Sequence, residues 1–331
     1  MEKAITAQKS ERCLTHYGRK TMKIKDIREN MGVEFLALVT MANQGVTNND
    51  SPYLNLELKD NTGTMVAKMW NVTADTVAKV KVGSLVKVRG TSLLYKDQLQ
   101  MKVLEITPVD TDEVDISQFV TVSPVPAAQL REILQSAVDS IENEKIKRIV
   151  QHIYRKYDRQ IYSSPAATRN HHEYFGGLAT HVSGMLKMAE AVCINYPEVN
   201  RDYLIAGVLL HDVGKIIELG GSSIAEYTTE GKLLGHITIS QTMVREAAEE
   251  LDIDSEEVMV LRHIILAHHG KREFGSPVLP LTMEAEVLHM IDDMDAKINM
   301  IGKELKDTRK GEFTKKIFSL DNRSFYKLKG E

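Results

Sequence analysis

The pattern of apolar and polar positions predicts a small β-domain at the start of the chain. Residues 33–42, VEFLALVTMA, predict a strand, and residues 53–60, YLNLELKD, alternate apolar and polar side chains as a half-buried strand does. Asn61–Gly63 predicts a hairpin turn into a third strand. A short helix and two further strands with a turn near Lys96–Asp97 complete the pattern.

Five strands with a helix after the third is the order of the oligonucleotide-binding barrel, the OB-fold. Tyr53, Trp70 and Tyr95 are candidates to stack on bases, although each of them fits the barrel core or its rim equally well. Between residues 20 and 110 there are 12 Lys/Arg and 10 Asp/Glu, a balance of +2. Charge therefore gives only weak support for nucleic-acid binding.

The period becomes helical from residue 127 and stays so to about residue 300, where helices alternate with loops and no convincing strand occurs. We expect an all-α bundle after the barrel. The expected organisation is a flexible lead-in, the OB-fold, an acidic and proline-punctuated linker, the helical domain and a basic-aromatic tail: 1–20, 21–110, 111–126, 127–305 and 306–331.

The tail allows two interpretations. Residues 302–331 carry nine Lys/Arg and five Asp/Glu, with Phe313, Phe318, Phe325 and Tyr326 between the charges. Basic residues interleaved with aromatics fit contact with nucleic acid. They fit equally a segment whose aromatics dock on the body of the protein while its lysines stay solvated.

Composition excludes several classes of protein. The chain has 331 residues, is 43% hydrophobic and carries a net charge of −4, so it has no overall basic character. Two cysteines, Cys13 and Cys193, provide no disulfide framework. No apolar run is long enough for a membrane span, and the N-terminus lacks the apolar core of a signal peptide. We expect a cytoplasmic protein.

The segment LIAGVLLHDVGKI, residues 204–216, carries the strongest chemical signal. Adjacent side chains on a helix point about 100° apart, so His211 and Asp212 cannot both lie on one apolar face. A buried divalent metal at the helix end resolves this, since it binds both groups and neutralises the carboxylate. Imidazole and carboxylate together suit Mn, Fe, Co or Zn. The alternative is an ordinary helix end capped by Asp212 and Gly214.

Other ionisable residues favour the metal. His181 lies in the apolar helical stretch GGLATHVSGML, His236 begins another helix after a glycine, and His268–His269 end the helix VLRHIILAHHG. Asp292 lies in the apolar stretch VLHMIDDMDAKI, where a carboxylate is costly unless it is neutralised. Such groups on several apolar helices of one domain indicate a central metal site in a helical bundle.

The order His181, His211–Asp212, then a distant Asp292 resembles the signature of HD-domain metal-dependent phosphohydrolases. An OB-fold followed by such a domain, with NHHEYFGGLATHV and LLHDVGKI, resembles the YhaM-type 3′–5′ exoribonucleases of Gram-positive bacteria. The resemblance implies removal of nucleotides from the 3′ end of single-stranded RNA, and perhaps of single-stranded DNA, supported by manganese or cobalt. Fe, Zn and Mg are the alternative metals.

The resemblance also implies the ligands. The first metal would bind His181, His211, Asp212 and Asp292; Asp212 would bridge to a second metal bound by His236, His268 and His269. Gly177 stands where some three-metal relatives have a glutamate, so we expect two ions. Asp293 and Asp295 compete with Asp292, which the motif register favours, and Asp293 is the expected support for a ligand. We expect His263 and His289 to lie in the core or behind the ligands.

The remaining residues are assigned to the substrate. Two metals about 3.5–4 Å apart would activate a water for in-line attack on a phosphodiester. Lys215 would contact the phosphate, unless it is only a cation at a helix C-terminus. Arg169, His171, His172 and Tyr174 precede the Gly-Gly pair and would touch the terminal nucleotide, while the barrel holds the upstream strand.

Two other functions compete with this one. The first is an HD hydrolase of a small nucleotide, although the loop residues typical of cyclic-dinucleotide enzymes are absent after His211–Asp212 and the barrel would have no clear use. The second is a non-catalytic nucleic-acid adaptor, which the presence of every expected ligand argues against. We also expect a homo-oligomer and no membrane partner.

Overall fold

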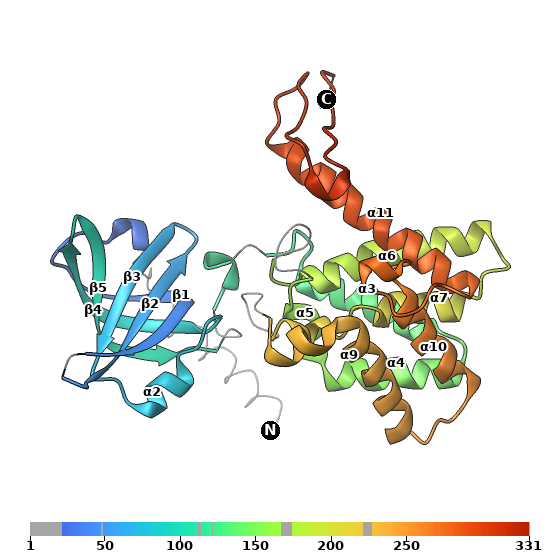
Figure 1. Cartoon of the computed structure of the whole chain (residues 1–331), viewed down its shortest axis with the longest axis horizontal. Coiled ribbons are helices and arrows are strands. Elements are labelled where there is room, and N and C mark those ends of the chain that lie inside the picture. The colour runs from blue at the N-terminus through green and yellow to red at the C-terminus, as the bar shows by residue number, and fades with distance from the viewer. Residues whose placement is uncertain are drawn as a thin grey trace, which may run out of the picture. The chain divides into compact units, whose positions relative to one another are not determined.

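The computed structural model describes residues 22–47, 49–110, 114–120, 122–166, 174–220 and 227–330. The chain divides into two compact units between Val122 and Ser123, and each is described by itself (Figure 1). The expected lead-in and three of the expected substrate residues, Arg169, His171 and His172, lie outside the described residues.

The first unit is a closed five-stranded barrel with the strand order β1-β2-β3-β5-β4. Neighbouring strands are antiparallel except for the parallel pair β3–β5. A short helix, α2 (Ala74–Lys79), lies between β3 and β4, as the OB-fold order predicts. The strands are β1 (Gly32–Val46), β2 (Pro52–Asp60), β3 (Gly63–Trp70), β4 (Leu85–Tyr95) and β5 (Gln98–Pro108).

The barrel closes because β1 is long enough to pair with two strands. Its first half pairs with β4 and its second half with β2, with an irregularity between Val39 and Met41. The sequence predicts the end of this strand at residue 42, which is wrong. The strand continues to Val46, where it pairs with Pro52, because cross-strand hydrogen bonds outweigh the turn preference of the local sequence.

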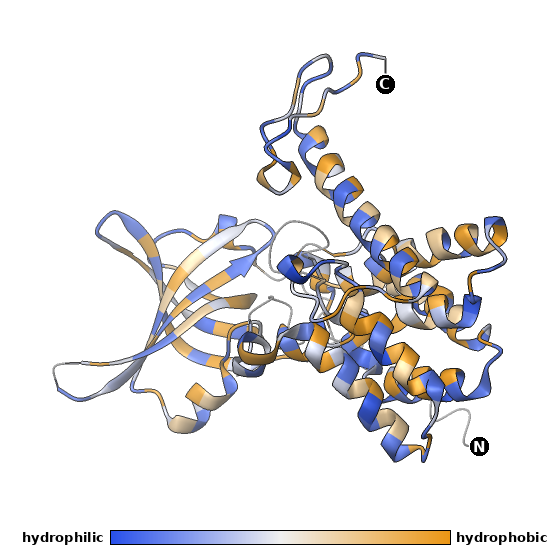
Figure 2. Cartoon of the chain, turned by 45° about the vertical axis from the view of Figure 1, so that its right-hand side comes forward, coloured by the Kyte–Doolittle hydropathy of each residue, from blue (hydrophilic) through white to orange (hydrophobic). Residues whose placement is uncertain are grey.

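The second unit is an all-α bundle, as the helical period predicts (Figure 1). Its core joins buried side chains from all of the longer helices, and the apolar faces are orange in Figure 2. The helices are α3 (Ala127–Asp139), α4 (Glu144–Lys156), α5 (Asp158–Ser163), α6 (Gly177–Asn195), α7 (Arg201–Leu210), α8 (Lys215–Glu218), α9 (Thr229–Glu250), α10 (Glu256–Ala267) and α11 (Met283–Lys306).

Side-chain caps and one close contact explain why the bundle forms where it does. Asn143, Asn200, Thr228 and Thr282 each accept a hydrogen bond from a backbone N–H in the first turn of α4, α7, α9 and α11 respectively. Gly207 lets α7 approach α10, since a Cβ there would lie 2.8 Å from Ile264 Cγ2. The apolar α7, which carries the His-Asp pair at its end, is thereby held inside the bundle.

The segment after α11 forms a small hairpin, with isolated bridges between Phe313 and Tyr326 and between Ile317 and Arg323. Phe313 is 66% exposed and Phe318 is 86% exposed, so these two rings do not dock on the body, whereas Phe325 is partly buried. Among the described residues, no helix is both long and apolar enough to cross a bilayer.

Candidate metal centre

Five helices of the bundle bring the predicted ligands to one place. His181 lies in the middle of α6, His211 caps the C-terminus of α7, and Asp212 follows it. His268 caps the C-terminus of α10, with His269 next along the chain. The remaining two residues, His236 of α9 and Asp292 of α11, complete the cluster.

The first group surrounds His181, whose Nε2 atom is buried. This nitrogen lies 3.3 Å from His211 Nε2, 3.3 Å from Asp292 Oδ1 and 3.8 Å from Asp212 Oδ2. One ligand atom from each of His181, His211 and Asp212 falls within 4.8 Å of the others. Four residues from three separate helical segments therefore offer donors to a common point.

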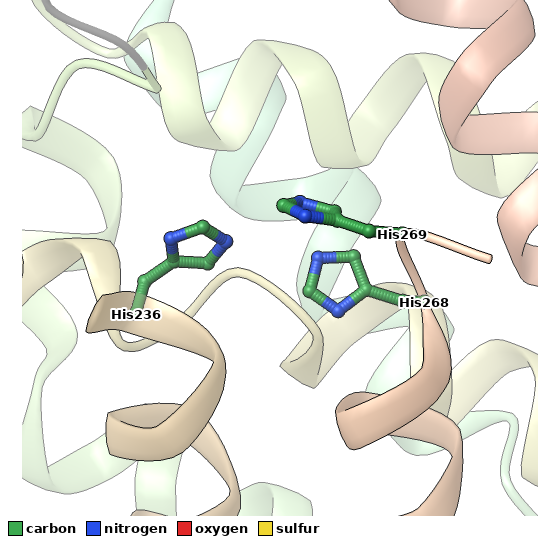
Figure 3. A group of neighbouring side chains, drawn as sticks. All are labelled: His236, His268 and His269. Carbon is green, nitrogen blue, oxygen red and sulfur yellow. The ribbon is translucent and has the colours of Figure 1, made fainter. Parts of the chain in front are cut away.

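The second group is formed by His236, His268 and His269, whose ligand atoms also lie within 4.8 Å of one another (Figure 3). Asp212 Oδ1 lies 3.4 Å from His236 Nε2 and 3.8 Å from His268 Nε2. Since Asp212 Oδ2 lies 3.5 Å from His211 Nε2, the two oxygens of this carboxylate face different groups of histidines.

The histidine tautomers suit metal binding. Every one of the five rings has its Nδ1 atom within hydrogen-bond distance of a carboxylate or carbonyl oxygen, so in the neutral ring Nδ1 carries the proton and Nε2 presents its lone pair. The pairs are His181–Asp295 at 2.7 Å, His211–Val208 O at 3.0 Å, His236–Glu218 at 3.2 Å, His268–Ile265 O at 2.7 Å and His269–Phe274 O at 2.7 Å.

Two buried atoms test whether the donors fit a metal. Asp212 Oδ1 and His236 Nε2 are both buried and have no hydrogen-bond partner. An unpaired buried acceptor costs free energy, and here two acceptors face each other. A divalent cation between them would satisfy both, so the residues present fit a metal.

The electrostatics of the first group also favour a cation. Burial by itself would lower the pKa of His181, but Asp292 and Asp295 raise it to about 9. Burial would raise the pKa of Asp212, yet Lys215 and the neighbouring imidazoles hold it well below its usual range. The pKa of His268 is well below its usual value because the ring is buried. The carboxylates are therefore ionised and His268 is neutral, as metal ligands must be.

Two supporting carboxylates complete the arrangement, and the sequence did not single out either of them for this role. Asp295 binds His181 Nδ1, whereas Asp293, the support expected from the sequence, is half exposed and lies 2.6 Å from Lys297 Nζ. The expectation for Asp293 is wrong because Asp295 lies one helical turn after Asp292 and so shares its face. The helical spacing of Asp292 and Asp295 is the signal that could have identified this partner.

Glu218 supports the second group. Its Oε1 atom accepts a hydrogen bond from the His236 backbone N–H at 3.0 Å as well as from the ring. The helix α9 is kinked at Gly235, whose φ of 71° is in the left-handed region. His236 therefore begins a new helical segment, and its N–H pairs with Glu218 because it has no partner within the helix. A glutamate in the apolar stretch VGKIIEL is the only sequence signal for Glu218.

Lys215 and Tyr174 lie next to the cluster. Lys215 is the first residue of α8, not a cation at a helix C-terminus, and its Nζ lies 2.6 Å from Asp212 Oδ2. Burial would lower the pKa of Lys215, but Asp212 raises it. The Tyr174 hydroxyl interacts with Thr180, the residue before His181, and burial raises its pKa.

Two further histidines that the sequence placed in the core or behind the ligands, His263 and His289, lie outside the cluster. His289 Nδ1 lies 3.1 Å from the carbonyl oxygen of His268, so it supports the backbone behind a predicted ligand. His263 Nε2 accepts a hydrogen bond from the Leu281 backbone N–H and contributes to loop structure.

The three predicted stacking residues of the barrel lie outside its buried core. Tyr53 and Trp70 are partners across β2 and β3, with ring centroids 5.1 Å apart, and Lys68 Nζ lies 5.8 Å from the centre of the Trp70 ring. Trp70 is 43% exposed and Tyr95 is 52% exposed. An aromatic pair with a neighbouring cation is therefore open to solvent at the ends of these strands.

Comparison with known families agrees with both units. Residues 178–297 match the model of the HD domain, and residues 37–109 match that of the OB-fold nucleic acid binding domain. The HD domain indicates a metal-dependent phosphohydrolase. Together the two domains support a nucleic-acid-binding phosphohydrolase.

Three solved structures that are similar to this chain each cover less than a third of it. The second OB-fold domain of replication protein A from Methanococcus maripaludis is 25% identical over 27% of this chain and 95% of its own, with a TM-score of 0.24. A replication protein A heterotrimer bound to ssDNA is 16% identical over 31% of this chain and 72% of its own, with a TM-score of 0.21. A deletion mutant of the single-stranded DNA binding protein from Thermus aquaticus is 16% identical over 28% of this chain and 46% of its own, with a TM-score of 0.23.

Proposed function

We propose that this protein is a metal-dependent 3′–5′ exonuclease that hydrolyses the terminal phosphodiester of single-stranded RNA, and also acts on single-stranded DNA. The observation that carries the proposal is the position of Asp212, whose two oxygens face two separate groups of imidazoles. A carboxylate shared in this way suits a pair of divalent ions, and a pair of ions suits phosphodiester hydrolysis.

The ligands divide between two ions. His181, His211 and Asp292 would hold the first, His236, His268 and His269 the second, and Asp212 would bind both. Mixed imidazole and carboxylate ligands suit manganese, with Co, Fe, Zn and Mg as alternatives. When bound, the ions supply positive charge for the phosphate and a water that is deprotonated at neutral pH. The choice of manganese, the count of two and a homo-oligomeric state stay predictions.

The protein's own residues would bind and orient the strand. Lys215 lies beside the shared carboxylate, where its buried ammonium group can donate to a phosphate oxygen of the substrate. Tyr174, whose hydroxyl interacts with Thr180 of α6, would contact the terminal nucleotide. Trp70, Tyr53 and Tyr95 would stack on bases farther from the 3′ end, because stacking holds a strand without regard to its sequence.

The proposal is tested with single-stranded RNA carrying a label at the 5′ or the 3′ end, incubated with Mn²⁺. The expected result is a ladder that shortens from the 3′ end with the first label and release of a labelled mononucleotide with the second. Asp212→Ala should lose this activity while still binding RNA, whereas the exposed Asp293→Asn should keep it.

The same assay separates the alternatives. A gel shift without products would favour the adaptor, and neither binding nor cleavage would favour hydrolysis of a small nucleotide. Full activity of Asp212→Ala would exclude the proposed mechanism.

A further inference from the structure

A tight turn follows the His268–His269 pair directly. We call residues 270–276, GKREFGS, the rim turn; it contains the short helix η4 (Arg272–Phe274). None of its side chains is a predicted metal ligand, yet the chain leaves the metal centre through it.

The rim turn is tied to His269 at two points. The His269 backbone N–H donates to Ser276 Oγ at 3.1 Å, and the His269 ring donates from Nδ1 to the Phe274 carbonyl oxygen at 2.7 Å. Ser276 is buried, and its own N–H donates to the Lys271 carbonyl at 3.3 Å. The backbone of Phe274 is therefore one hydrogen bond away from a predicted ligand.

Two glycines fix the path of the turn. Gly270 has a φ of +76° and Gly275 a φ of +102°, both in the left-handed region. A Cβ at Gly270 would lie 2.3 Å from His289 Nε2, so this close approach also requires glycine. The two glycines and the hydrogen bonds to His269 therefore hold the backbone of Phe274 in a defined position relative to His269.

The side chains of residues 271–274 in this fixed turn are exposed to solvent. Phe274 is 56% exposed, whereas Phe35 and Phe119 are 1% exposed. Lys271 Nζ lies 5.2 Å from the centre of the Phe274 ring. Arg272 is exposed, and its guanidinium forms no ion pair or hydrogen bond with the described residues. Lys271 Nζ also lies 3.8 Å from Glu273 Oε1, an exposed pair that contributes little to stability. An aromatic ring and two exposed cations are thus displayed together beside the metal centre.

We propose that Phe274 stacks on a base near the 3′ end of the substrate strand while Lys271 and Arg272 contact its phosphates. This rests on the proposed function and assigns a substrate-binding surface to it. A nucleic-acid strand fits better than an apolar partner, because Lys271 and Arg272 outweigh the single carboxylate Glu273 and lie in the same turn as the ring. A base offers a face for the ring, and its phosphates offer negative charge for the cations. Stacking tolerates every base, so the contact would help a sequence-independent nuclease keep its terminal nucleotides in place.

The test compares the full-length protein with Phe274→Ala, Phe274→Trp and the control Tyr196→Ala, which removes a 60% exposed ring at the C-terminal end of α6. With single-stranded RNA and Mn²⁺, Phe274→Ala should raise KM about 10-fold, from the usual strength of one base–aromatic stack, and change kcat less than KM. Phe274→Trp should restore KM, and Tyr196→Ala should leave it unchanged.

Abasic substrates identify the contact. A tetrahydrofuran residue is placed in turn at each of the last few positions of the strand. At one of these positions the wild type and Phe274→Ala should have the same KM, because no base is left to stack. A KM difference that persists at every position would overturn the proposal.

Bis(p-nitrophenyl) phosphate separates stacking from a structural effect on His269, since it reports on the metal centre without a nucleobase. Phe274→Ala should hydrolyse it at the wild-type rate; an equal loss on both substrates would overturn the stacking role.

If the wild type binds RNA without cleaving it, the exonuclease proposal fails by itself. The Phe274 proposal then requires that Phe274→Ala weakens RNA binding about 10-fold in fluorescence anisotropy, and unchanged binding would refute it.

Discussion

His236 Nε2 lies 3.4 Å from Asp212 Oδ1, and both atoms are buried without a hydrogen-bond partner. Glu218 accepts from Nδ1 of this ring, so the neutral ring presents the lone pair of Nε2 to the carboxylate. Two acceptors in contact are unfavourable unless a cation lies between them. This pair is therefore the clearest sign that the cluster is organised for metal and not for internal hydrogen bonding.

The first prediction concerns metal stoichiometry. Asp212→Asn should reduce bound Mn²⁺ from about two ions per chain to one or fewer, since an amide cannot provide two anionic oxygens. Isothermal titration calorimetry and elemental analysis after dialysis measure this. Asp254→Asn, an exposed residue away from the cluster, is the matched control. Two retained ions in Asp212→Asn would show that this carboxylate is not shared.

The second prediction concerns the support for His181. Asp295→Asn should lower Mn²⁺ affinity about 10- to 100-fold, because Asp295 holds the ring at Nδ1 and increases the basicity of Nε2. Asp293 lies on the same helix and pairs with Lys297 at the surface. The Mn²⁺ affinity of the Asp293→Asn variant should therefore stay unchanged. Equal effects of the two substitutions would contradict the assignment of Asp295.

The third prediction separates the two ions. Glu218→Gln should weaken the binding of one ion about tenfold and leave the other nearly unchanged, because Glu218 accepts hydrogen bonds from the ring and the backbone N–H of His236, a predicted ligand of the second ion. A two-site fit to calorimetric data measures both affinities. The control is Glu246→Gln, because Glu246 is an exposed residue of α9, the helix that carries His236. Equal weakening of both ions would indicate that the sites are not separable.

The fourth prediction concerns the packing that holds the His-Asp pair. Gly207→Ala should destabilise the helical unit by about 1–3 kcal/mol, since its Cβ would meet Ile264 Cγ2 at 2.8 Å. Gly302→Ala on α11 meets no atom within 4 Å and should stabilise the helix by about 0.5–1 kcal/mol. Urea unfolding monitored by circular dichroism compares the two. A stabilising Gly207→Ala would mean that α7 and α10 are less closely packed than described.

The fifth prediction concerns the barrel. Trp70→Ala should weaken binding of single-stranded RNA by about 1–3 kcal/mol, the usual value of one stacked base, without lowering the melting temperature appreciably. The ring is 43% exposed, so little of the barrel core is lost with it. Leu104→Ala removes an apolar side chain that is 59% exposed and serves as the control. Anisotropy titration gives the affinities, and equal effects of both variants would argue against stacking.

The strand order and the all-α character of the second unit follow from local periodicity, because strands and helices impose different spacings of apolar residues. The end of β1 does not follow from it. Gln44 and Val46 lie in a sequence rich in turn formers, and only their partners on β2 keep them extended. Local preference is weak compared with the hydrogen bonds and packing of a closed barrel.

The sequence by itself determined which residues are candidates for a metal site: histidines and aspartates placed on apolar helices cannot remain buried unless something satisfies them. Only the tertiary structure decided how they are used. It gave each oxygen of Asp212 to a different group, chose Asp295 over Asp293, recruited Glu218 for His236, and displayed Phe274 beside the centre. These choices depend on distances between segments far apart in the chain, and such distances are fixed by helix packing, not by spacing along the sequence.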